Sequence, residues 1–325
     1  MISAEVYSFM DDTAIDARVG ALNDALHREL VSAKGRCWLL LDPVLRPILE
    51  ESPLGCLLVE RPFFRAQGTG DPDPSLMPLL FAFDPATASD HDLIWQSLRE
   101  ALAELAPERL AQGSGRRICG WLESAADGKA LARYIATQMI QTHGEARQRL
   151  LRWHDPAVLW ALWPLLTTEQ QASLLGPINA FRVLDPAGHW LRFGARQPAT
   201  RQTLDLDGEQ WRGIESIAPL NAVLREIDLS PLRSERLDAL RDDALAALRR
   251  ARQLGFSDFQ DQRTFARLAL TVHADFDTHP LVAERLAQRA PDDHFTALVD
   301  DLSAEDWARI RQDSANPVTR QSPKQ

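Results

Sequence analysis

Apolar and polar positions follow two different patterns along the chain, and the change falls near residue 200. Before it, short all-apolar runs at 37–41, 56–59, 77–83 and 118–122 alternate with segments whose apolar residues are three and four apart. Short continuous apolar runs indicate strands that are buried on both faces. Apolar residues at steps of three and four indicate amphipathic helices.

Strands separated by helices are typical of a parallel sheet covered on both sides. A further strand is expected at 150–153, after a helix over 125–142. The segments 178–184 and 189–193 flank Asp-Pro-Ala-Gly, a turn sequence that predicts a β-hairpin. Residues 1–200 are therefore predicted to form an α/β lobe with a mostly parallel sheet, helices on both faces and a hairpin at one edge.

Residues 201–313 show no convincing strand pattern and are predicted to form an all-α lobe. The helix expected at 233–254 has the clearest apolar stripe, which consists of Leu237, Leu240, Ala244, Leu248 and Ala251. Gly255 suits the position just beyond its end. Further helices are expected near 209–228, 258–272, 280–289, 291–299 and 303–313. The polar tail 314–325, with two prolines, is predicted to be disordered.

Charge and composition narrow the classes of partner. The formal net charge is −10, which argues against nucleic acid as a partner, because phosphate recognition needs a basic surface. No apolar stretch approaches the roughly 20 residues that span a bilayer, and the first residues lack the pattern of a secretion signal. The three cysteines, Cys37, Cys56 and Cys119, fit neither a disulfide framework nor a zinc site and are expected to be buried, reduced thiols. A cytoplasmic protein without cofactor or membrane partner is therefore expected.

No common catalytic signature is present: the sequence has no Gly-x-Ser-x-Gly, phosphate-binding loop, His-Glu-x-x-His or Cys-x-x-Cys. One segment resembles a metal site, with His273, Asp275, Asp277 and His279 at alternate positions. In an extended chain these side chains would share one face and could bind zinc or iron. A metal-dependent hydrolase that uses these residues is therefore the alternative hypothesis. The favoured interpretation of the segment is a plain loop between two helices. The favoured prediction is a protein that is not an enzyme and has neither catalytic nor metal-binding residues.

The densest segment is 149–166, Arg-Leu-Leu-Arg-Trp-His-Asp-Pro-Ala-Val-Leu-Trp-Ala-Leu-Trp-Pro-Leu-Leu. Asp155 suits the N-cap of a helix, because its carboxylate can accept hydrogen bonds from the first turn. Pro156 suits the first helical position, where its missing N–H is not needed. Arg152 is placed to pair with Asp155 or with another carboxylate at a strand end.

The helix expected after this cap, residues 157–163, is apolar on every side. Such a helix is either fully buried or partly covered by a partner. Trp160 and Trp163 are therefore core residues or, alternatively, partner-binding residues, since tryptophan is frequent at interface hot spots.

This segment resembles a hallmark of the family called domain of unknown function 4123, an Arg-aromatic-x-Asp-Pro-Arg-Val-Leu sequence followed by a Gly-Pro step and a short hairpin. Ala157 departs from it, because arginine is frequent at that position in the family. The early run 37–41 with Asp42 and the helical second lobe look similar too, so the resemblance extends over most of residues 1–312. The matching positions are Arg152, Trp153, Asp155, Pro156, Val158, Leu159, Gly176 and Pro177.

The resemblance implies a function that composition and periodicity do not show. Members of this family act as adaptor chaperones of the bacterial type VI secretion system. Each is thought to bind one toxic effector in the cytosol and to help load it onto the spike protein at the tube tip. The expected partners are thus a cognate effector and a spike protein, and the motif residues are expected to be structural or partner-binding.

Overall fold

The structure is a computed structural model that describes residues 12–31, 33, 35–44, 49–66, 77–106, 109–110, 115–143 and 147–315. The chain divides into two compact units, residues 1–211 and 212–325. Within the described residues, every helix is too short or too polar to cross a membrane. Most of the tail predicted to be disordered, residues 316–325, lies outside the described part of the chain.

The first unit is built on a six-stranded sheet with the order β2-β3-β1-β4-β7-β8. Every pairing in it is antiparallel, so the prediction of a mostly parallel sheet is wrong. The predicted hairpin at one edge is present as β7 and β8. The strands are β1 (Arg36–Leu41), β2 (Phe63–Arg65), β3 (Leu79–Phe83), β4 (Ile118–Ser124), β7 (Ile178–Leu184) and β8 (Trp190–Phe193).

The position of β1 explains the error. Strands β3 and β4 are joined through a helix and are parallel to each other, but β1 lies between them and runs the opposite way. The order β3, helix, β4 in the sequence is therefore that of a parallel unit. In the sheet, however, both strands are hydrogen-bonded to the antiparallel β1. Apolar runs report burial of both faces and carry no information about strand direction.

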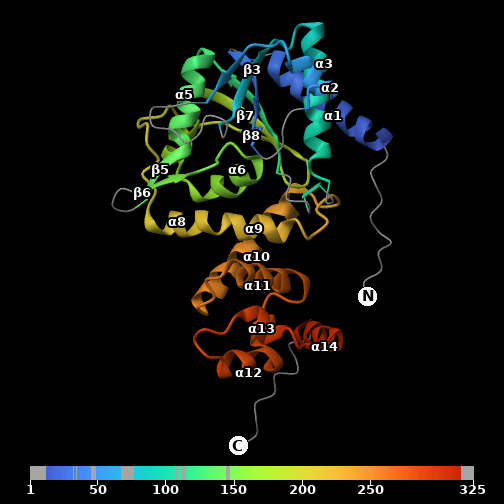
Figure 1. Cartoon of the computed structure of the whole chain (residues 1–325), viewed down its shortest axis with the longest axis vertical. Coiled ribbons are helices and arrows are strands. Elements are labelled where there is room, and N and C mark those ends of the chain that lie inside the picture. The colour runs from blue at the N-terminus through green and yellow to red at the C-terminus, as the bar shows by residue number, and fades with distance from the viewer. Residues whose placement is uncertain are drawn as a thin grey trace, which may run out of the picture. The chain divides into compact units, whose positions relative to one another are not determined.

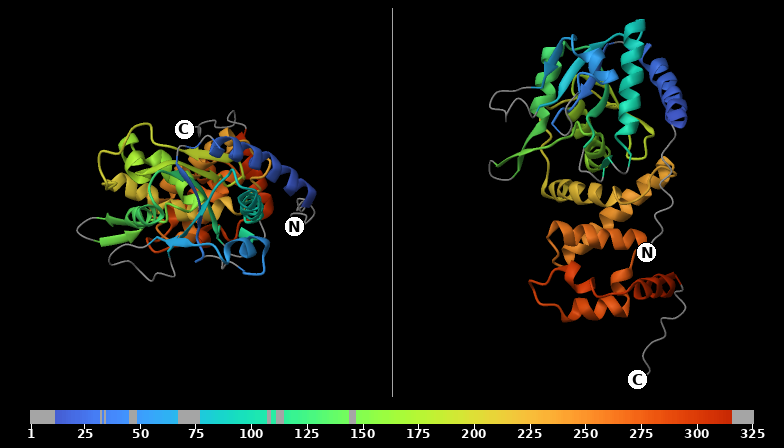
Figure 2. Two further views of the ribbon diagram at one scale, coloured as in Figure 1. Left: turned by 90° about the horizontal axis from the view of Figure 1, so that it is seen from above. Right: turned by 45° about the vertical axis from the view of Figure 1, so that its right-hand side comes forward.

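Helices cover both faces of the sheet, as predicted (Figures 1 and 2). On one face, α1 (Asp12–Val31), α2 (Pro53–Leu58) and α3 (Ala88–Ala103) pack in one apolar cluster with Cys37, Leu39 and Leu41 of β1. On the other face, α5 (Gly128–Met139) starts against Trp38. Alternate residues of β1 thus contact different helices, which is the reason for its unbroken apolar run.

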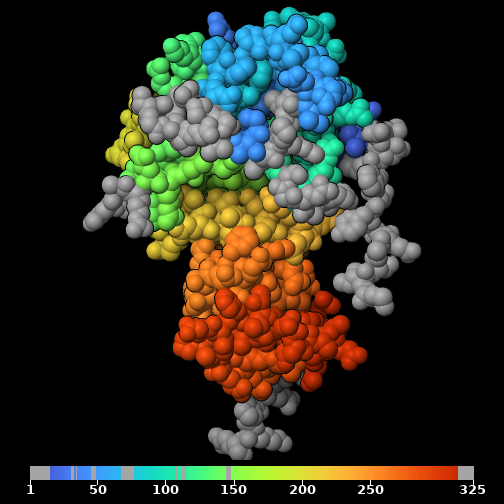
Figure 3. Space-filling model, viewed as in Figure 1, coloured from blue at the N-terminus to red at the C-terminus, as the bar shows by residue number. Residues whose placement is uncertain are grey.

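The strand predicted at 56–59 is absent. Residues 56–58 are the last three residues of helix α2, and Val59 follows as its C-cap. Ser52 caps this helix by accepting from the Gly55 N–H, and Pro53 starts it. Cys56 is exposed, whereas Cys37 and Cys119 are buried as expected. The exposure of Cys56 agrees with the location of α2 and β2 at the surface of the first unit, where they are coloured light blue in Figure 3.

The predicted helix over 125–142 ends at Met139, and the chain then forms a separate two-stranded ribbon of β5 (Ile140–His143) and β6 (Arg147–Leu150). The strand predicted at 150–153 is thus displaced toward the N-terminus. After it come α6 (Pro156–Leu162), a 3₁₀ turn η2 (Trp163–Leu165) and α7 (Thr168–Leu175). The sequence pattern did not predict β2, the ribbon or α7.

The described part of the second unit, residues 212–315, contains helices joined by turns and no strand, as predicted. Its core includes four of the five residues of the predicted α10 stripe, all but the half-buried Leu240. It also includes an aromatic cluster of Phe256, Phe265, Phe276 and Phe295. Helix α8 (Gly208–Glu215) spans the division between the units. The other elements are α9 (Ile217–Leu224), α10 (Ser234–Gln253), α11 (Phe259–Thr271), η3 (Phe276–Thr278), α12 (Pro280–Gln288), α13 (Phe295–Val299) and α14 (Ala304–Ala315).

A β-bulge in β4 sets the end of β1. Leu40 lies opposite Gly120 and Leu41 opposite Ile118, so one extra residue, Cys119, is accommodated. Gly120 has a φ of 144°, and a Cβ there would collide with the carbonyl oxygen of Arg182. The bulge therefore requires glycine. Just beyond it, the Asp42 N–H donates to the carbonyl oxygen of Arg117 (2.8 Å).

We expect Gly120→Ala to lower the free energy of unfolding by about 3 kcal/mol, because it adds both backbone strain and a steric clash. Gly208→Ala is the control, since a Cβ at Gly208 meets nothing within 4 Å, and its effect should stay within about 1 kcal/mol. Urea denaturation followed by tryptophan fluorescence measures both. Equal effects of the two substitutions would show that the bulge tolerates a side chain.

Candidate functional site

The Arg-Trp-His-Asp-Pro motif forms an irregular turn between β6 and α6. The N–H of Trp153 donates to the Leu151 carbonyl and that of Asp155 to the Arg152 carbonyl. This turn directs two side chains, those of Arg152 and His154, toward the end of β1. Trp153 points into the core, where it is fully buried and makes an edge contact with Phe181.

Arg152 and His154 share one acceptor, the Asp42 carboxylate. Arg152 Nη2 and His154 Nε2 each lie 2.7 Å from Asp42 Oδ2. The other oxygen, Oδ1, accepts from the Val44 N–H at 3.0 Å. Asp42 and His154 are buried, and Arg152 is partly exposed. The carboxylate that pairs with Arg152 is thus Asp42 and not Asp155, and these three residues are called the Asp42 network below.

The Asp42 network stabilises a buried negative charge. Burial by itself raises the pKa of Asp42, but the hydrogen bond from His154, the charge of Arg152 and the Val44 N–H outweigh it. The pKa of Asp42 therefore lies below its ordinary value, and the carboxylate is ionised at neutral pH.

The histidine of this network is oriented by the same contact. His154 Nδ1 is buried and has no hydrogen-bond partner among the described residues. A proton on Nδ1 would be an unsatisfied buried donor, which costs about 1–3 kcal/mol. The arrangement favours the tautomer that carries its proton on Nε2 and donates it to Asp42.

Asp155 and Pro156 occupy the positions expected from the sequence. Asp155 Oδ1 accepts from the Ala157 N–H at 2.9 Å, and Pro156 is the first residue of α6. The cap fixes where α6 begins, and the Asp42 network fixes the turn before it. These motif residues are therefore bound to one another and to the backbone of their own chain.

The Gly-Pro step has a similar structural role. Gly176 ends α7 with a φ of 51°, and a Cβ at this position would collide with the ring of Tyr134 in α5. The carbonyl oxygen of Pro177 accepts from the hydroxyl of Ser124 at the end of β4 (2.7 Å). Both residues hold α7 against the sheet.

The two tryptophans after the motif differ in exposure. Trp160 is 4% exposed, so it belongs to the core of the first unit. Trp163 is half-buried, packs against Phe193 and lines a cavity with residues of β8 and α7. Of the two predicted partner-binding residues, only Trp163 lies where a partner could reach it.

The segment of the alternative metal-site hypothesis is not extended. Residues Phe276–Thr278 form a 3₁₀ turn that buries Phe276. Arg250 pairs with Asp275 (3.4 Å) and Asp277 (3.0 Å), while His279 caps α12. The alternation that would align the four side chains is therefore lost.

Another group of potential metal ligands, not recognised in the sequence, consists of Asp258, Asp261 and His294. Asp258 caps α11. Asp261 accepts from the His294 ring and from the N–H and hydroxyl of Thr296. These hydrogen bonds connect α11 to α13, so the side chains already have a structural role in the second unit.

Comparison with known families identifies one match. A family model described as "Domain of unknown function (DUF4123)" matches residues 37–173, which confirms the resemblance over that segment. The segment contains Asp42 and the whole Arg-Trp-His-Asp-Pro motif. Gly176, Pro177, the hairpin and the second unit lie beyond it. No curated protein and no solved structure matches the chain.

We expect Asp42→Ala to lower the free energy of unfolding by about 3 kcal/mol, because it leaves Arg152 and His154 without their buried acceptor. Asp155→Ala, in the same motif, should cost about 1 kcal/mol, through loss of a helix cap. Urea denaturation of both variants gives the comparison. A smaller loss for Asp42→Ala than for Asp155→Ala would contradict the central role of Asp42.

The difference in the free energy of unfolding between wild type and Asp42→Ala depends on pH. Because the native pKa of Asp42 is lowered, its contribution is fully present above the unfolded-state pKa of about 3.9. It is lost as the pH falls through the lower native pKa. The difference in stability between wild type and Asp42→Ala should therefore shrink as the pH falls below about 4.

Proposed function

Because residues 37–173 carry a domain of the DUF4123 family, we propose that this protein is an effector-specific adaptor of a type VI secretion system. The family is associated with type VI effector adaptors. In this proposal the protein binds one toxic effector in the cytosol by stoichiometric association. It then helps to load the effector onto the spike protein at the tube tip, without chemical turnover.

The family match is the observation that carries the proposal, and the geometry of the motif supports it. The ionisable side chains of the motif, Arg152, His154 and Asp155, are engaged with Asp42 or with the backbone. Such an arrangement stabilises a scaffold and orients the elements that follow it. Binding then depends on the surface that this scaffold presents.

Effector binding is tested by co-expressing the protein with the product of each adjacent gene and purifying it through an affinity tag. We expect one neighbouring effector to co-purify at a fixed stoichiometry, with an interface that buries about 1,600 Å² in total. Failure to retain any neighbouring effector or spike protein would argue strongly against an adaptor.

A destabilised variant provides the control for this experiment. Asp155→Ala should reduce co-purification only as far as it reduces the folded fraction, because the cap faces the backbone of its own helix. Selective loss of binding at an unchanged melting temperature would instead place Asp155 in the interface. Metal analysis of the same preparation checks the competing hydrolase hypothesis, which requires a stoichiometric transition metal.

A further inference from the structure

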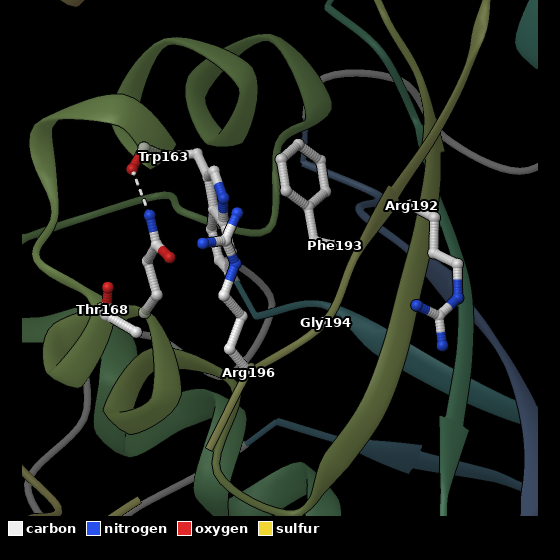
Figure 4. Close-up of a pocket in the computed structure, with 7 residues that line it drawn as sticks. Trp163, Thr168, Arg192, Phe193, Gly194 and Arg196 are labelled. Atoms are coloured by element: carbon white, nitrogen blue, oxygen red, sulfur yellow. Dashed lines mark hydrogen bonds between the residues drawn. The ribbon is translucent and has the colours of Figure 1, made fainter. Parts of the chain in front are cut away.

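A cavity of about 360 Å³ lies where the chain leaves the family motif and meets the edge hairpin (Figure 4). It is formed within the first unit by the start of η2, helix α7 and the end of β8. Its volume is at the lower end of the range for ligand pockets, roughly 300–1,000 Å³, so it suits a few side chains and not a whole helix. The lining residues are Trp163, Thr168, Gln171, Arg192, Phe193, Gly194 and Arg196.

The wall of the cavity is held in place before any ligand binds. The rings of Trp163 and Phe193 pack with their centroids 4.9 Å apart. Gln171 Nε2 donates to the carbonyl oxygens of Trp163 (3.0 Å) and Leu166 (3.3 Å), so it attaches η2 to α7. A wall that is ordered in advance lowers the entropic cost of binding.

The cavity carries positive charge that its surroundings compensate only partly. Arg192 is exposed, and its one ion pair among the described residues is with Glu29, at 3.7 Å. The same Glu29 oxygen lies 2.7 Å from Arg182. Arg196 is exposed and forms no ion pair with any described carboxylate. Exposed pairs contribute little energy, so both guanidinium groups can accept a new partner at small cost.

The lining selects a particular kind of ligand. The groups that face the cavity are mainly polar: guanidinium, amide and hydroxyl. Arginine binds carboxylates through paired N–H donors, and this local positive site belongs to a chain with a net charge of −10. In Figure 4, Arg192 and Arg196 lie on opposite sides of Phe193. The ligand that fits this arrangement is an extended segment with more than one acidic side chain.

We propose that this cavity binds an acidic segment of the effector, with Arg192 and Arg196 as the residues that determine specificity. The proposal rests on the adaptor function proposed above. Trp163, Thr168 and Gln171 lie inside the segment that matches the family, 37–173, whereas both arginines lie outside it. The cavity thus combines a wall from the shared domain with charges from the part of the chain beyond the family match.

The test measures affinity for the effector that co-purifies with the wild-type protein. Arg192→Glu combined with Arg196→Glu should weaken binding by about tenfold or more and remove most of its salt dependence. Arg133→Glu is the matched control. It makes one such charge reversal, half that of the double variant, at an exposed position of α5 that does not line the cavity, and it should change the Kd by no more than about twofold. Thermal melting confirms that all variants are folded.

A second arm identifies the ligand directly. Overlapping peptides that cover the captured effector should include one that binds the wild-type protein and loses binding when its acids are changed to amides. Changing those acids to lysine in the effector should restore affinity for the double-glutamate variant. If the wild type and the folded Arg192→Glu/Arg196→Glu variant bind the effector with equal affinity, the cavity proposal is overturned and the adaptor function stays intact. If the wild type captures no neighbouring effector, both proposals fall.

Discussion

The hydrogen bonds of Arg152 and His154 to the buried Asp42 carboxylate are the interaction on which the arrangement of the motif depends. Asp42 lies at the end of β1, the strand between β3 and β4, and receives hydrogen bonds from Arg152 and His154, about 110 residues later in the chain. A buried carboxylate is unfavourable unless donors and positive charge surround it. The turn that contains Arg152 and His154 is therefore held at the sheet, and helix α6 starts from that fixed position.

The consequences extend from the network to the surface. The Asp155 cap sets the first turn of α6, and the seven residues of α6 lead directly into η2 and Trp163. The Gln171 side chain then joins η2 to α7. In this way the Asp42 network at the end of β1 helps to set where Trp163 packs against Phe193 of β8 and where the cavity forms. The motif residues therefore contribute to the position of Trp163 at the cavity.

Much of this organisation could be predicted from local sequence. The strands at 37–41, 77–83 and 118–122, the edge hairpin, the helical second unit and the cap at Asp155 depend on contacts between near neighbours or on burial of a continuous run. The strand prediction at 56–59 is wrong because a run of four apolar residues fits either conformation. The ribbon of β5 and β6 was missed because its strands are short and mixed in polarity. Arg192 and Arg196 were missed as site residues because isolated arginines carry no motif.

Sequence by itself determined that the runs at 37–41, 79–83 and 118–122 are largely buried, where α6 begins and which family the segment 37–173 resembles, since periodicity, capping and motif order are local properties. Only the tertiary structure decided that the sheet is antiparallel, that Arg152 pairs with Asp42, that Trp160 is buried and that Trp163 lines a cavity. The physical reason is that strand order and ion-pair partners result from contacts between residues far apart in the chain. An apolar run has the same pattern whichever direction its neighbour takes, and a carboxylate has the same sequence signal whichever arginine it binds.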